Sequence, residues 1–180
     1  MRLLVVLYVF TIFGIGILEG ILSMRWMVSY YRYGIPIFSK RIPSDISTSS
    51  SSISDLLSRQ APQSWGQPQE FHPISENELA FRDATKFRIR LIPYILIMRG
   101  LITRLPLDRT IIVKGYVNWS LVVLVALGIP LVGAYSIFVL ILFVAFFYCI
   151  SSINYSSQAK VYRRIVEILR DKGQLAKTQL

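Results

Sequence analysis

Two long apolar blocks, residues 3–24 and 116–152, constrain the fold of this chain more than any other feature. The first block has about 22 residues, which as a helix would span roughly 33 Å, enough to cross a hydrocarbon core of about 30 Å. Lys and Arg fall almost entirely outside the two blocks, which is typical of integral membrane proteins. The chain has 53% hydrophobic residues, only 17% charged residues and a net charge of +10, whereas soluble domains average about 25% charged residues. We therefore predict a mainly α membrane protein with basic extramembrane parts.

Residues 1–42 are predicted to form an N-terminal transmembrane anchor followed by an interfacial collar. A removed signal peptide is the alternative, but the apolar run is longer than the usual core of a signal and no A-x-A-like cleavage site follows it. The positive-inside rule places the N-terminus outside and the next segment in the cytoplasm, because only Arg2 precedes the helix while several basic residues follow it: Arg25, Arg32, Lys40 and Arg41. The collar "RWMVSYYRYG" is expected to hold four aromatic residues at headgroup level: Trp26, Tyr30, Tyr31 and Tyr33.

One face of the first helix carries small or polar residues at helical spacings of three and four: Gly16, Glu19, Gly20 and Ser23. In the first interpretation this face packs on a partner helix, with the two glycines allowing close approach and Glu19 bonded across the contact. In the second, the glycines occur by chance and Glu19 reaches the interface or is protonated. The sequence does not separate the two.

Residues 43–75 are rich in Ser, Pro and Gln and are predicted to be a flexible linker. Residues 76–115 are predicted to form a basic, β-rich cytoplasmic region. Apolar and basic residues alternate over 87–91, and the runs 94–105 and 110–119 are also β-rich, with the turn sequence "PLDR" between them. The simplest assembly is an antiparallel meander of about three strands, which is too small to be stable alone and needs a cover.

The basic residues of this region are candidates for contact with an anionic surface: Arg88, Arg90, Arg99, Arg104 and Lys114. An ordinary basic loop that obeys the positive-inside rule explains the same charge. Nucleic acid is not expected as a partner, because no recognisable reader motif accompanies the charge.

The second block, residues 116–152, is too long for one membrane span, since about 37 helical residues would measure roughly 55 Å. With one boundary residue added, 116–153 is predicted to be a helical hairpin in the membrane. Three helix-breaking residues lie near its centre in "GIPLVGAYS" and are predicted to form a turn: Gly128, Pro130 and Gly133. Both flanks are basic, so both should be cytoplasmic, which requires a helical hairpin that either crosses the membrane or re-enters.

Residues 154–180 are predicted to form a basic amphipathic helix with Val161, Ile165, Ile168 and Leu169 on one face. Such a helix could lie on the membrane, bind a partner or cover the predicted sheet, and the sheet's need for a cover favours the last two.

The sequence contains no recognisable catalytic constellation, phosphate loop or metal-ligand spacing, with one cysteine and one histidine in 180 residues. We therefore expect a protein without enzyme activity, cofactor or metal. The favoured function is an accessory, structural or assembly subunit of a larger membrane complex, with other membrane proteins as partners. The alternative is a membrane-anchored module that binds anionic lipid or an acidic cytoplasmic partner through its basic β region. A transporter or intramembrane enzyme using Glu19 is a weaker third class. The expected location is a bacterial-type inner (plasma) membrane, as a multi-pass protein with residues 25–115 and the C-terminus in the cytoplasm.

Overall fold

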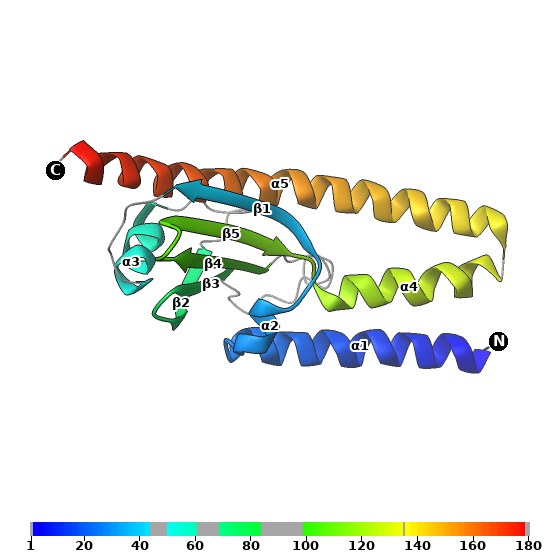
Figure 1. Cartoon of the computed structure of the whole chain (residues 1–180). Helices are drawn as coiled ribbons and strands as arrows, with labels where there is room; N and C mark the ends of the chain where they lie inside the picture. The colour runs from blue at the N-terminus through cyan, green and yellow to red at the C-terminus, as the bar shows by residue number, and fades with distance from the viewer. Residues whose placement is uncertain (1, 44–49, 61–68, 84–98, 135, 179–180) are drawn as a thin grey trace.

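The computed structural model describes residues 2–43, 50–60, 69–83, 99–134 and 136–178. It combines helices with a five-stranded antiparallel sheet, so the expected mixture of helices and antiparallel strands is confirmed. Two helices, α1 (Arg2–Met24) and α5 (Ile137–Thr178), contain stretches long and apolar enough to cross a membrane. Figure 1 shows α1, the shorter α4 (Trp119–Gly133) and the first half of α5 extending side by side from one end of the sheet.

The sheet has the strand order β1-β5-β4-β3-β2. Its strands are β1 (Pro36–Pro43), β2 (Gln69–Ser75), β3 (Glu78–Asp83), β4 (Arg99–Leu105) and β5 (Thr110–Tyr116). β4 and β5 lie within the two predicted β-rich runs and form a hairpin across "PLDR", with Arg99 opposite Tyr116. The strand expected at 87–91 lies outside the described residues. The sheet also takes in β1 and β2, which lie outside the predicted meander, because each pairs with a strand of that region.

Part of the expected linker is folded. Residues Ser50–Gln60 form helix α3, in which Ile53 and Leu57 lie one turn apart and are buried in the main core. These two residues stand among serines, so the apolar face is too narrow to stand out from composition, and its contact with β2 stabilises it.

The second half of α5 covers one face of the sheet, as Figure 1 shows. Four of its side chains, Val161, Ile165, Ile168 and Leu169, are buried in the core with sheet residues such as Val113. The predicted amphipathic helix within 154–180 is therefore present, and of its two favoured roles, binding a partner or covering the sheet, the described residues show the second. Its start differs, however, because α5 continues from the apolar half without a break and measures 42 residues, or about 63 Å.

A helical hairpin is present, and its reversal falls at the C-terminal end of the predicted turn stretch "GIPLVGAYS" and not at Gly128 or Pro130. Gly128 and Pro130 lie inside α4, Gly133 is its last residue, and the chain reverses between Gly133 and Ile137. Gly128 is needed for packing, since a Cβ there would lie 2.7 Å from both the Phe143 ring and the Tyr8 hydroxyl. The close approach of α1, α4 and α5 at this point explains the glycine better than a turn does.

α2 (Val28–Arg32) is a short helix that follows α1. Figure 1 places it beside the end of α1 nearest the sheet, while the N-terminus and the α4–α5 connection lie together at the opposite end of the helices. The junction between helices and sheet is therefore the place where α1, α2 and α4 meet the sheet.

Candidate functional site at the junction of helices and sheet

Glu19 is the centre of this junction, although it belongs to an apolar helix. It is 5% exposed, and its Oε1 atom accepts hydrogen bonds from the Tyr30 hydroxyl at 2.8 Å and the Trp119 backbone N–H at 2.7 Å. Arg99 Nη1 donates to the same oxygen at 3.3 Å. One carboxylate oxygen thus joins α1, α2, β4 and α4.

The second carboxylate oxygen of Glu19 caps helix α4. Oε2 accepts hydrogen bonds from the Ser120 backbone N–H at 3.0 Å and from the Ser120 hydroxyl at 2.5 Å. Asn118 occupies the usual capping position but makes no side-chain cap. The first N–H groups of a helix have no partner within it and carry a partial positive charge. Glu19 supplies both the acceptor and the negative charge from another helix.

Arg99 neutralises Glu19 and fastens the junction to the sheet. Its side chain is 1% exposed, Nη2 donates to the Tyr33 carbonyl at 2.6 Å, and the guanidinium lies 3.8 Å from the centre of the Tyr30 ring. Gly34 makes room for it, since a Cβ there would lie 2.5 Å from Arg99 Nη2. A buried charge is retained where it is paired and hydrogen-bonded, as Glu19 and Arg99 are here, although Arg99 Nε has no hydrogen-bond partner among the described residues.

The enclosure also affects Tyr30. Burial raises the pKa of the Tyr30 hydroxyl far above its usual value, and the negative charge of Glu19 raises it further. The hydroxyl therefore remains a donor to Glu19 throughout the physiological pH range.

A second set of contacts ties the end of α1 to strands β2 and β3. Arg82 Nη1 donates to the Ser23 carbonyl at 2.5 Å, and Arg82 pairs with Glu70 at 2.9 Å. The guanidinium of Arg82 also lies 4.3 Å from the centre of the Trp26 ring. Trp26 has a φ of 52°, which is unusual for a residue with a side chain and marks the reversal between α1 and α2.

The predicted polar stripe of α1 divides into two parts. Glu19 and Ser23 face the protein, whereas a Cβ added at Gly16 or Gly20 would meet nothing within 4 Å. Glu19 is bonded to another helix, as the first interpretation required, but that helix is α4 of the same chain.

The predicted collar is wrong for two of its residues. Tyr30 and Tyr31 are buried in a small core with Ala80, Leu101 and Tyr116. Both hydroxyls find partners near the end of α1, so the protein interior holds them in place of the headgroup layer.

The predicted anionic-surface contacts do not form one surface. Arg99 is buried in the junction, so its assignment to a surface is wrong. Arg104 and Lys114 are half-buried and lie on opposite faces of the sheet, because Arg104 follows the core residue Ile102 by two positions while Lys114 precedes Tyr116 of the other cluster by two. Arg88 and Arg90 lie outside the described residues.

Sequence reasoning singled out Glu19 but missed its partners. A carboxylate inside an apolar helix demands a cation, yet nothing local distinguishes Arg99 from the other basic residues. The other available signal was Ser120 at the start of an apolar helix, a residue type that favours helix N-termini.

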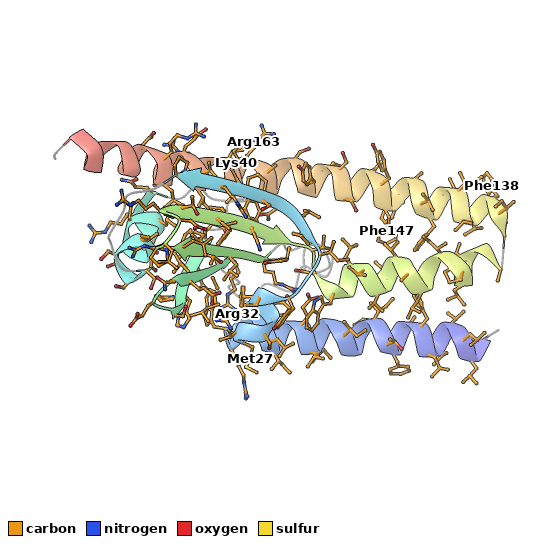
Figure 2. The ribbon with its side chains drawn as sticks, viewed as in Figure 1. Met27, Arg32, Lys40, Phe138, Phe147 and Arg163 are labelled. Atoms are coloured by element: carbon orange, nitrogen blue, oxygen red, sulfur yellow. The ribbon has the colours of Figure 1, made fainter. Side chains whose placement is uncertain are left out.

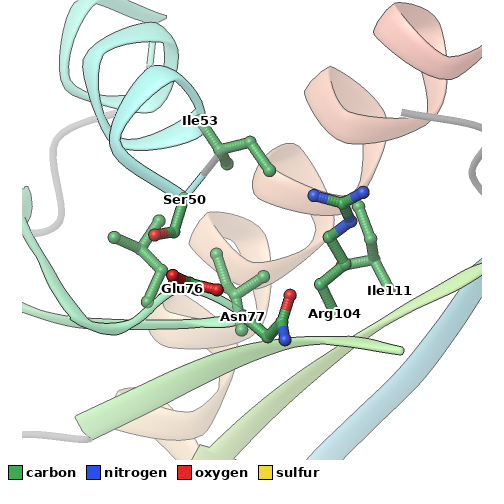
Figure 3. Close-up of a pocket in the computed structure, with 8 residues that line it drawn as sticks. Ser50, Ile53, Glu76, Asn77, Arg104 and Ile111 are labelled. Carbon is green, nitrogen blue, oxygen red and sulfur yellow. The ribbon is translucent and has the colours of Figure 1, made fainter. Parts of the chain in front are cut away.

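The described residues offer little space for a ligand. Figure 3 shows a pocket between α3 and the sheet, near Ser50, Ile53, Glu76 and Arg104, with room for about 10 Å³, roughly one water molecule. No group of three or more His, Cys, Asp or Glu residues that could hold a metal ion occurs in the described part of the chain. The junction itself is filled by its own side chains and is suited to holding elements together.

Comparisons with known proteins identify no function, so the function is argued from the residues of the junction. No protein-family model, curated protein or solved structure matches the chain.

Proposed function

We propose that the chain is a non-enzymatic integral membrane protein that serves as an accessory, structural or assembly subunit of a larger membrane complex. It would be multi-pass, with the N-terminus and the hairpin apex outside and the sheet in the cytoplasm of a bacterial-type plasma membrane.

One observation carries the proposal: the apolar parts of α1 and α5 are left uncovered by a chain that otherwise builds two closed cores. Phe10 of α1 is 72% exposed and Phe138 of α5 is 66% exposed, as are many neighbours of both. In water such a surface would be strongly unfavourable, at about 25 cal/mol per Å². A bilayer removes this cost, and Figure 2 shows side chains such as Phe138 directed away from the helices of the chain.

The row of helices supports the subunit role in particular. α4 contacts both α1 and α5, and α1 and α5 each leave an outer side without a neighbour among the described elements. The junction around Glu19 fixes α1 and α4 to the sheet, and no substrate-sized cavity is found there among the described residues, which favours a scaffold over a catalyst.

Purification in mild detergents tests the proposal. We expect other membrane proteins to co-purify at a fixed ratio, and a clean monomer in several detergents would refute the subunit role. Gly16→Leu should release a partner that packs closely on α1, whereas Gly14→Leu, on the other side of the helix, should not. A Cβ added at either position would meet no atom of the described chain within 4 Å, so both variants should fold.

The sidedness of the membrane topology needs its own measurement. A tag at the C-terminus should be inaccessible in intact cells and accessible after permeabilisation. A tag accessible in intact cells would reverse the proposed orientation.

A further inference from the structure

Five apolar or aromatic side chains remain exposed at the end of the predicted membrane span and just after it in the sequence. We call Met24, Met27, Val28, Tyr33 and Ile35 the interfacial belt, since each is more than one-third exposed. They surround the short helix α2, whose opposite side buries Tyr30 and Tyr31. Scattered apolar residues are common on protein surfaces, but five within twelve positions next to a membrane helix form a continuous group.

The belt lies level with the last turns of α1 and not beyond them. The Tyr30 hydroxyl reaches Glu19 at 2.8 Å and the Tyr31 hydroxyl lies 3.3 Å from Ser23 Oγ, so α2 folds back beside residues 19–23. Ile21 of α1 is itself exposed at this level. At the other end of the belt, the Ile35 carbonyl accepts a hydrogen bond from the Val117 N–H at 3.1 Å, which places it beside the start of α4.

Arg25 gives the belt a cationic group with no ion-pair partner among the described residues. It is exposed, and none of the ion pairs among the described residues includes it. Arg32 differs, because it pairs with Glu78 at 2.7 Å and its charge is compensated. Trp26, between them, stacks on Tyr31 and His72 and belongs to the protein side of the corner.

We infer that the interfacial belt is embedded at the headgroup–acyl boundary of the bilayer that α1 crosses, with the Arg25 guanidinium on the phosphate of an anionic lipid. Continuity with the uncovered surface of α1, the level set by the two tyrosine contacts and the free charge of Arg25 all favour this occupant. The inference rests on the membrane location in the proposed function, and it assigns lipid contact to the α2 corner in place of the basic β region.

Site-directed spin labelling of the full chain in vesicles tests the belt. Cys149 is replaced by serine, and a nitroxide is attached to a single cysteine at Val28 or, as the control, at Leu107. Leu107 is 97% exposed in the turn after β4, and β4 begins beside Glu19 and runs away from the helices, so this label should be in water. We expect the label at residue 28 to collide with oxygen more than with a water-soluble nickel chelate, and the label at 107 to do the opposite.

Two results at residue 28 would overturn the inference. Accessibility equal to that at residue 107 would mean that the belt is in water, and protection from both reagents would mean that protein covers it. If the chain is instead extracted from vesicles by alkaline carbonate, the membrane location itself fails, which distinguishes the two proposals.

The Arg25 contact has a separate test. Adding phosphatidylglycerol to phosphatidylcholine vesicles should lower the nickel accessibility at residue 28 in the parent chain. Arg25→Gln should abolish this difference, while Arg109→Gln, in the same turn as Leu107, should keep it. Equal accessibility in both kinds of vesicle for the parent chain would refute the phosphate contact.

Discussion

Glu19→Gln should destabilise the fold by about 3–5 kcal/mol, the cost of removing one member of a buried ion pair. The substitution keeps the shape of the side chain but leaves Arg99, which is 1% exposed, without a counter-charge. The NH₂ group of the new amide would also face hydrogen-bond donors. The Ser120 N–H, the Ser120 hydroxyl and the Trp119 N–H all donate to the carboxylate of Glu19.

The matched control is Glu78→Gln, the same chemical change in an ion pair that water reaches. The side chain of Arg32 is 48% exposed and that of Glu78 is 15% exposed, so the loss should be about 1 kcal/mol. In a chain of this size 1 kcal/mol corresponds to roughly 2–4 °C in Tm, so Glu19→Gln should lower Tm by roughly 6–20 °C. Circular dichroism of the purified protein in detergent micelles measures both variants, with denaturant titration as a second assay.

A double-mutant cycle tests the mechanism behind the number. Glu19→Gln combined with Arg99→Gln should cost clearly less than the sum of the two single variants, because the second change removes the uncompensated charge. Additive losses, or a Glu19→Gln variant as stable as Glu78→Gln, would refute the buried pair as the fastening of helices to sheet.

Three further predictions follow from other contacts. Gly128→Leu should cost at least about 1–3 kcal/mol by forcing α1 and α5 away from α4, while Gly14→Leu should be near neutral, and equal Tm values would contradict the packing role. Ile165→Ala should lower the free energy of unfolding by about 2–5 kcal/mol, because Ile165 is fully buried against the sheet. Amide hydrogen exchange should become faster in β1 and β5. Unchanged protection of these strands would argue against α5 as their cover. Tyr30 should stay protonated well above pH 10, since its pKa is raised in the folded state. The free energy of unfolding should then be unchanged below the pKa of an unfolded tyrosine and fall as pH rises past about 10. Tyr30→Phe should remove part of this fall when unfolding is measured against pH.

The two long apolar helices and the covering helix were predictable because a long apolar run and a regular helical spacing are strong signals. A run such as residues 3–24 needs only composition and length, and the spacing of Ile165, Ile168 and Leu169 defines a helix face by itself. Strands β4 and β5 were predictable for a related reason, since the turn between them has a local sequence signal.

The junction depended on contacts that sequence patterns do not carry. Glu19 and Arg99 are separated by 80 positions, and they meet through the pairing of β1 with β5 and of β5 with β4. The glycine at position 128 was interpreted as a turn because a helix breaker and a packing glycine look alike without the neighbouring helix. The same limit applies to Tyr30, an aromatic residue next to arginines that resembles an interfacial anchor until its hydroxyl partner is known.

The unbroken path of α5 has a consequence for biogenesis. The residues that close the apolar face of the sheet follow the hairpin directly in the chain, so a ribosome completes every strand before it supplies their cover. Until the second half of α5 has been made, Ile42, Leu79 and Val113 of the sheet lack their cover, and exposed apolar surface promotes aggregation. If the chain inserts into a membrane as proposed, its sheet would therefore close only after the whole hairpin has been synthesised.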